Sequence, residues 1–220
     1  MLGDQSAAGP FEKHLRDALA LNRERAGYYA DVSAGASRPI SRTLIAAELV
    51  LLPVARWFDY HATPYHEAGI PILEALFVPI SSVPPVSTGA SRLPSDRQST
   101  RLRPADIRRH VGSAYRSGSF AAAATALTSE LATLRNDPHV NCLVRHLLES
   151  AHRLASLAPA NLALARDRGL ASPATLLAQL FWLHLWGLTA AAALDRRARP
   201  LQERGIPILE QDLPPISEAT

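Results

Sequence analysis

The sequence DYHATPYHEAGIPILEALFVPIS at residues 59–81 returns near the C-terminus as DRRARPLQERGIPILEQDLPPIS at residues 195–217. Thirteen of the 23 aligned positions are identical at a constant offset of 136 residues, including an unbroken Gly-Ile-Pro-Ile-Leu-Glu. Such agreement indicates an internal duplication, and a repeat constrains the architecture of the whole chain. We therefore expect two similar halves, related by a pseudo-twofold axis, that share one core.

Both halves show the same order of predicted elements. A break rich in Gly and Pro, at residues 35–39 and again at 169–173, separates a first helix from a more apolar second helix. Glycine suits the left-handed residue that follows a helix, and proline suits the first turn of the next one. The pattern predicts an all-α, internally duplicated domain of roughly six to eight helices, built from helix pairs broken at Gly and Pro.

The predicted organisation has four parts. The first helical repeat covers residues 1–81 and the second covers residues 141–220. A flexible linker rich in Pro, Ser and Arg covers residues 82–103, and connecting helices, expected at 104–117 and 120–135, fall within residues 104–140. In the first repeat, Pro53 is expected to kink or end the second helix. The Gly-Ile-Pro-Ile-Leu-Glu segments are expected to be extended chain followed by a turn.

The composition excludes several classes of protein. With 47% hydrophobic and 20% charged residues, the chain has the composition of a globular protein. A net charge of +3 is too small to indicate nucleic-acid binding. The lone cysteine, Cys142, excludes an internal disulfide and favours a reducing, cytoplasmic location.

Residues 176–194 carry no formal charge and approach the length of a membrane span. Their counterpart in the first repeat, residues 43–58, contains Glu48 and Arg56. Two similar halves of one fold are expected to lie in the same surroundings, either water or lipid. Because charged residues interrupt the first segment, we interpret both segments as central buried helices and expect no membrane span.

Seven arginines make the linker and the helix after it locally basic. Nucleic acid or an acidic protein surface could bind them, but aromatic residues are absent until Tyr115, and a solvated linker is the preferred interpretation. The seven are Arg92, Arg97, Arg101, Arg103, Arg108, Arg109 and Arg116.

No standard catalytic motif is present, so candidate sites come from polar groups in apolar surroundings. Glu48 and His184 coincide in the repeat, and each interrupts an apolar helix. If these helices pack around the pseudo-twofold axis, the two side chains are expected to approach each other. A structural hydrogen bond and a functional pair, as metal ligands or as acid and base, both remain open.

A second candidate adds imidazole and carboxylate at i, i+3 spacing on the first helix of each half. Together with Glu48 and His184, these pairs give three histidines and three carboxylates on four helices, which is the composition of a di-iron site. The pairs are His14 with Asp17 and His146 with Glu149. They run in the opposite order to the usual Glu-x-x-His, and a helical projection places Asp17 and Glu149 outside the apolar face. A solvated surface position is therefore the preferred interpretation of the two carboxylates, and for Glu149 the flanking Arg145 and Arg153 suggest a surface ion-pair ladder.

A third candidate comes from differences between the two copies. Four side chains, Tyr60, His61, Tyr65 and His66, have no counterpart of their kind in the second copy, where Arg196, Arg197, Leu201 and Gln202 stand. They are candidates for binding a metal or a planar ligand, although a partly exposed helix end explains them as well. The Asp59 carboxylate, which both copies keep, is interpreted as structural. Beside His184, Trp182 and Trp186 suit an organic or haem ligand.

Two functions follow from these observations. The favoured one is a helical binding or accessory protein, which holds a protein partner, a ligand or a second copy of itself through apolar helices. The alternative is a helical His/carboxylate metalloprotein, resembling a di-iron oxidase in composition, with iron or another transition metal between the repeats. Whether the protein is an enzyme stays undecided at this level.

Overall fold

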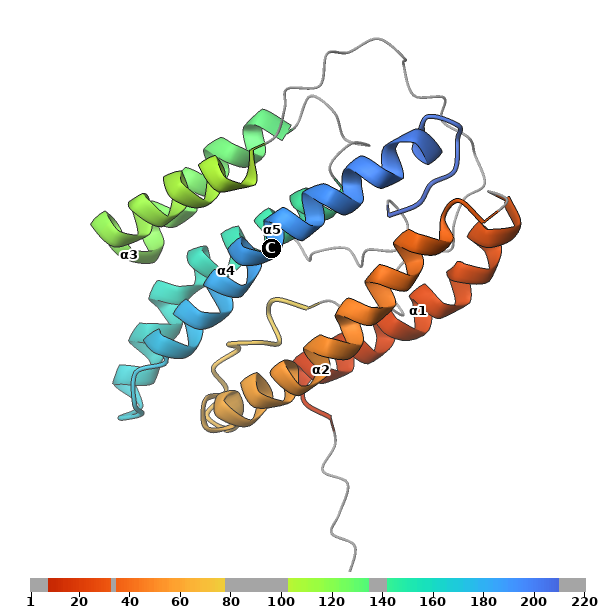
Figure 1. Ribbon diagram of the computed structural model, residues 1–220. Coiled ribbons are helices and arrows are strands. Elements are labelled where there is room, and N and C mark those ends of the chain that lie inside the picture. Colours follow the sequence, from red (N-terminus) through yellow and green to blue (C-terminus); the bar gives the residue numbers. More distant parts are fainter. Residues whose placement is uncertain (1–7, 33–34, 78–102, 135–141, 210–220) are drawn as a thin grey trace, which may run out of the picture.

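A computed structural model describes residues 8–32, 35–77, 103–134 and 142–209, which form five helices and no strand (Figure 1). The all-α prediction is therefore confirmed. The helices are α1 (Pro10–Val32), α2 (Arg38–Glu67), α3 (Pro104–Leu134), α4 (Cys142–Asp167) and α5 (Ala174–Gln202). Most of the predicted linker lies outside the described residues.

Two helical hairpins and the kinked element α3 make up the fold. The α1–α2 hairpin and the α4–α5 hairpin meet where α2 packs on α5, and α3 packs across α4 and α5 (Figure 1). All five helices contribute buried side chains to a single hydrophobic cluster, represented by Phe11, Phe58, Val111, Leu148 and Phe181.

Each helix of the two hairpins ends at a glycine with positive φ. Gly35 and Gly169 have φ of 84° and 67° after the first helices, and Gly69 and Gly205 have φ of 70° and 80° after the second. This left-handed conformation is the one that a helix C-terminus commonly requires, and glycine adopts it without strain. The Gly/Pro breaks predicted from the sequence therefore mark the turns.

The residues after Gly69 and Gly205 form non-helical segments that fill the core. Ile70, Ile72 and Leu73 are buried in the first, and Ile206, Ile208 and Leu209 are buried in the second. The main-chain N–H of Ile72 donates to the carbonyl of Ile70 at 2.9 Å, and that of Ile208 donates to Ile206 at 2.8 Å. Both copies of the repeated sequence thus share a backbone pattern, and they contribute packing rather than chemistry.

One aspartate in each hairpin caps the N-terminus of the neighbouring helix. The Asp59 carboxylate of α2 accepts hydrogen bonds from the main-chain N–H of Phe11 at 3.0 Å and of Glu12 at 2.8 Å in α1. Asp195 of α5 accepts from Leu143 and Val144 in α4, both at 3.0 Å. These are N–H groups that a helix cannot satisfy internally, and a carboxylate also complements the positive end of the helix dipole.

The segment that follows the second helix of each hairpin contacts the other hairpin near the end of its first helix. The Tyr29 hydroxyl at the end of α1 donates to the carbonyl of Pro207 at 3.1 Å. On the other side, Gly69 lies beside Arg168 in the α4–α5 turn, with 3.4 Å between Arg168 Nη1 and the position of a Cβ on the glycine. The two hairpins therefore interlock in both directions.

The helix count and Pro53 bear on two further predictions. The described residues contain five helical elements rather than six to eight helices. One of them, α3, consists of two helices joined across a kink at Gly118 and Ser119, so the helices expected at 104–117 and 120–135 are both present. They lie side by side, with 2.6 Å between Nδ1 of His110 and Oε1 of Glu130. Pro53 does not end its helix, because α2 continues through it. That proline lies on the exposed side of α2, where water can hydrate the carbonyl that loses its hydrogen-bond partner.

Among the described helices, α5 is long and apolar enough to cross a membrane, with a mean hydropathy of 1.4 over its most apolar window. Half of that window is buried inside the protein. The buried side of α5 includes Leu177, Leu180, Phe181, Leu185 and Leu188, so its apolar character serves the shared core at least in part.

Candidate functional site

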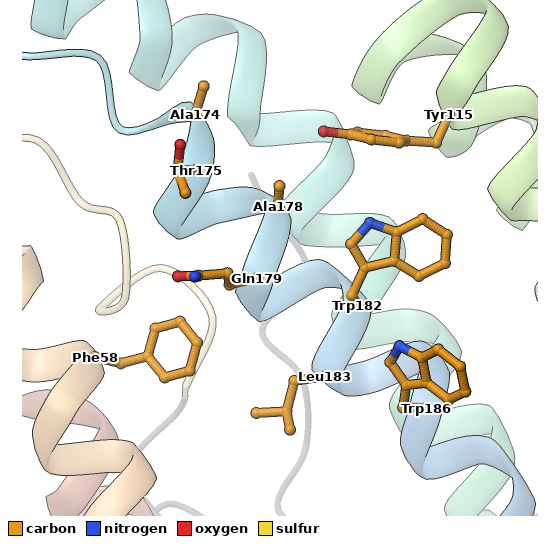
Figure 2. A pocket seen from close by; sticks show the side chains of 9 residues that line it. All are labelled: Phe58, Tyr115, Ala174, Thr175, Ala178, Gln179, Trp182, Leu183 and Trp186. Carbon is orange, nitrogen blue, oxygen red and sulfur yellow. The ribbon is translucent and has the colours of Figure 1, made fainter.

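An open groove with a volume of about 580 Å³ runs along the N-terminal half of α5, with α2 and α3 at its sides (Figure 2). We call it the aromatic groove. It is lined by Phe58, Tyr115, Ala174, Thr175, Ala178, Gln179, Trp182, Leu183 and Trp186. Its volume lies within the range of sites that bind ligands, and its lining is mostly apolar.

Seven of these residues form two parallel rows on α5. One row, Ala174, Ala178, Trp182 and Trp186, advances by four residues at each step. The second row, Thr175, Gln179 and Leu183, lies beside it. Residues four apart lie on the same side of a helix, so both rows face the groove.

Residues from two other helices complete the walls. Phe58 of α2 lies across from Gln179 and Leu183, and Tyr115 of α3 lies on the other side, near Trp182 (Figure 2). The Tyr115 and Trp182 rings meet edge to face at 6.0 Å between centroids, and Tyr115 also stacks on Phe181 at 5.4 Å. Tyr115 is therefore held by aromatic contacts on two sides.

A glycine of α3 sets the position of Trp182. A Cβ placed on Gly112 lies only 2.8 Å from Cη2 of Trp182, closer than real Cβ atoms approach other heavy atoms. Any larger residue at position 112 therefore forces the indole to move. Gly112 is buried in α3, where its small size admits the ring.

Helix α3 forms one edge of the groove, and this edge carries basic side chains. The Arg108 guanidinium lies over the ring of Trp186, 4.7 Å from its centroid, and donates to the Thr189 hydroxyl at 3.5 Å. Arg116 lies on the same helix, 3.8 Å from the Cβ position of Gly112. Trp186 itself is 64% exposed, an unusual state for so large an apolar side chain.

The predicted pair of Glu48 and His184 is held by other partners. The Glu48 carboxylate accepts a hydrogen bond from the Asn22 amide of α1. His184 is buried, and its Nδ1 lies 2.7 Å from the carbonyl of Leu180, so Nδ1–H is the donor. Burial lowers the pKa of His184, and this hydrogen bond raises it in part.

Three of the predicted histidines gather at the junction of α1, α4 and α5. Burial, and to a smaller extent electrostatic repulsion by His14 and His184, lower the pKa of His146 to about 3. The neutral form of His146 is therefore the stable one in the folded protein at neutral pH. The ring of His14 also packs on Phe77, at 4.6 Å between centroids.

The predicted metal ligands do not form a metal-binding group. Within the described residues, no three His, Cys, Asp or Glu side chains lie close enough together to hold a metal ion. Both i, i+3 carboxylates, Asp17 and Glu149, are partly exposed, as expected for residues outside the apolar face of each helix.

The side chains that are specific to the first copy do not gather into one site. Tyr60 is 75% exposed and packs edge to face on His61, whose ring lies 4.3 Å from that of Trp57. Tyr65 is buried in the core, and His66 pairs with Glu74 in the following segment. Tyr60, His61 and His66 are thus exposed near the end of α2, whereas Tyr65 belongs to the core.

The sequence pointed to two of the groove's aromatic residues and missed two. Trp182 and Trp186 were candidates for ligand binding, and both line the groove. Phe58 and Tyr115 were not, because only tertiary packing brings α2 and α3 beside α5. The one local signal was Gly112 in the middle of a helix, where glycine usually has a packing reason.

Comparison with known proteins gives no assignment: no family model, curated protein sequence or solved structure matches this chain.

Proposed function

We propose that this protein is a helical binding or accessory protein that holds an apolar partner in the aromatic groove and carries no catalytic centre of its own. The observation that carries the proposal is the pair of indoles one turn apart on α5, which stand in an open groove with Phe58 and Tyr115 as its walls. Tryptophan and tyrosine supply much of the binding energy at protein interfaces.

Exposure supports the same function. A tryptophan that is 64% exposed gains little from folding, whereas covering it on binding removes a large apolar area from water. The groove's position at the meeting point of α2, α3 and α5 also allows a partner to contact both hairpins at once.

A neutral apolar dye tests the groove directly. N-phenyl-1-naphthylamine is expected to bind with enhanced fluorescence, and Trp186→Ala is expected to weaken its binding about tenfold, as for a residue that dominates an interface. Tyr28→Ala is the matched control, because Tyr28 is a 50% exposed aromatic residue of α1 outside the groove. Equal dye binding by both variants contradicts the proposal.

We also propose that the two hairpins descend from one duplicated ancestor. Support comes from the equivalent caps of Asp59 and Asp195, from the equivalent positive-φ glycines, and from reciprocal contacts between the segment after each second helix and the end of the other hairpin's first helix. Helix α3, which contributes one wall of the groove, lies between the two repeats in sequence and packs on the second. The binding site is accordingly a feature of the assembled fold and not of either hairpin.

A further inference from the structure

We infer that the occupant of the aromatic groove is an amphipathic helix of another protein, with an apolar face for the groove and acidic residues for the α3 edge. The inference rests on the proposed function and adds the class of partner.

The shape of the groove favours a helix over a small molecule. Small ligands are usually bound in sites that enclose most of their surface, whereas this groove is open to solvent along its length. The two rows of α5 advance by four residues, and the channel between such rows accepts the side-chain ridge of another helix. From Ala174 to Trp186 the rows extend about 18 Å, the length of three helical turns.

The side chains along the first row change from small to large, which gives the groove a shape that a helix with large apolar residues can complement. Ala174 and Ala178 leave space at one end, and Trp182 and Trp186 project at the other. A helix with large apolar residues at i, i+4 and i+7 can place its first anchor over the alanines and its last between the indoles.

The charges along the edge select an acidic partner. Arg108 and Arg116 lie on α3 beside Trp186 and Gly112, and neither forms an ion pair with a carboxylate among the described residues. Arg109, by contrast, pairs with Asp106 one turn earlier. The groove's own lining contains no carboxylate. Two guanidinium groups that have no carboxylate partner among the described residues, next to an apolar surface, favour glutamate or aspartate on the flank of the bound helix.

Synthetic peptides of about 18 residues, long enough to cover the rows, test the inference on the full chain. One peptide carries leucine on one helical face and glutamate on the other, and a second replaces every glutamate with lysine. A third keeps the composition of the first but scatters its leucines. The leucine/glutamate peptide is expected to bind at least about tenfold more tightly than either of the others, as measured by fluorescence anisotropy.

A charge-reversal pair at Gln179 provides the matched control, because this side chain is exposed within the groove. Gln179→Glu should weaken binding of the leucine/glutamate peptide about threefold, and Gln179→Lys should strengthen it by a similar factor. Arg116→Gln should weaken binding in the same way, whereas Arg197→Gln, at an exposed position in the C-terminal part of α5, should leave it unchanged.

Several results overturn the inference and leave the proposed function intact. One is that the lysine peptide binds as tightly as the leucine/glutamate peptide or more tightly. Another is that a proline-rich peptide or phosphatidylglycerol vesicles bind better than the leucine/glutamate peptide. A third is that the chain dimerises and that Trp186→Ala abolishes the dimer. Dye binding that is the same in Trp186→Ala and in Tyr28→Ala, in contrast, overturns the proposed function itself. Circular dichroism of each variant separates these outcomes from unfolding.

Discussion

Asp59 and Asp195 lie at the same position of the two hairpins, and each carboxylate caps the neighbouring helix through two main-chain N–H groups. The two sites differ in burial, because Asp195 is only 3% exposed and Asp59 is partly exposed. Burial raises the pKa of both carboxyl groups, in the case of Asp195 to about 6. The same cap is therefore held in two different environments.

Removing either cap should destabilise the fold. Asp59→Ala and Asp195→Ala each leave two N–H groups of a helix start without an acceptor, and we expect a loss of about 1–3 kcal/mol in the free energy of unfolding. Urea denaturation at pH 7 measures it. Asp167→Ala, at an exposed carboxylate near the end of α4, is the control and should change the stability by less than about 0.5 kcal/mol. Unchanged stability in both cap variants contradicts the assignment.

The raised pKa of Asp195 predicts a pH dependence of known sign. A carboxyl group with a folded pKa of about 6 and an ordinary value of 3.8 binds its proton more tightly in the folded state. Its stabilising contribution is complete below the ordinary value and is lost as the pH rises through about 6. The stability of Asp195→Asn relative to the parent should thus increase between pH 4 and pH 7.5, by up to about 3 kcal/mol. A difference that is flat over this range contradicts the prediction.

The lowered pKa of His146 leads us to expect the opposite dependence of stability on pH. Its folded pKa of about 3 lies below the ordinary value of 6.5, so its contribution is present above 6.5 and is lost as the pH falls towards 3. We expect His146→Gln to lose less stability than the parent between pH 7 and pH 4. The midpoints of urea denaturation at both pH values measure this difference. A larger loss of stability on acidification in the variant than in the parent contradicts the prediction. Because His146 and Asp195 act in opposite directions, their contributions partly cancel in the parent, and each is measured from its own variant.

The close contact between Gly112 and Trp182 leads us to expect that a larger residue at position 112 changes both the stability of the fold and ligand binding in the groove. In Gly112→Ala the added methyl group displaces the Trp182 indole, which should lower the stability by about 1–2 kcal/mol and weaken dye binding. Gly27→Ala is the matched control, since no atom lies within 4 Å of a Cβ there and Gly27 is also helical. That control should stabilise the protein by about 0.5–1 kcal/mol. Unaltered dye binding and tryptophan fluorescence in Gly112→Ala contradict the predicted displacement.

A double-mutant cycle tests the pair that the repeat suggested. Glu48 and His184 hydrogen-bond to Asn22 and Leu180, and Glu48 is not among the groups that perturb the pKa of His184. The effects of Glu48→Gln and His184→Gln on stability should therefore add to within about 0.5 kcal/mol. A coupling energy above about 1 kcal/mol would show that the two side chains act together.

Much of the fold can be predicted from local features of the sequence. Gly35 and Gly169 mark turns because few other residues tolerate positive φ, and the repeat identifies Asp59 as structural because both copies keep it. The groove could be predicted only in part. Trp182 and Trp186 stand out in the sequence, but Phe58 and Tyr115 join them through the packing of α2 and α3, which no local pattern encodes. The predicted metal ligands do not come together among the described residues for a related reason. The sequence shows which residues could bind a metal, but it does not show whether their side chains meet at one point.

Helix α3 has a consequence for stoichiometry. It packs on the α4–α5 hairpin, and among the described helices no counterpart covers the α1–α2 hairpin. The approximate symmetry of the hairpins therefore does not extend to the surface, since Tyr115, Gly112 and the arginine edge occur once per chain. We therefore expect a partner of the aromatic groove to bind, at saturation, at one copy per chain.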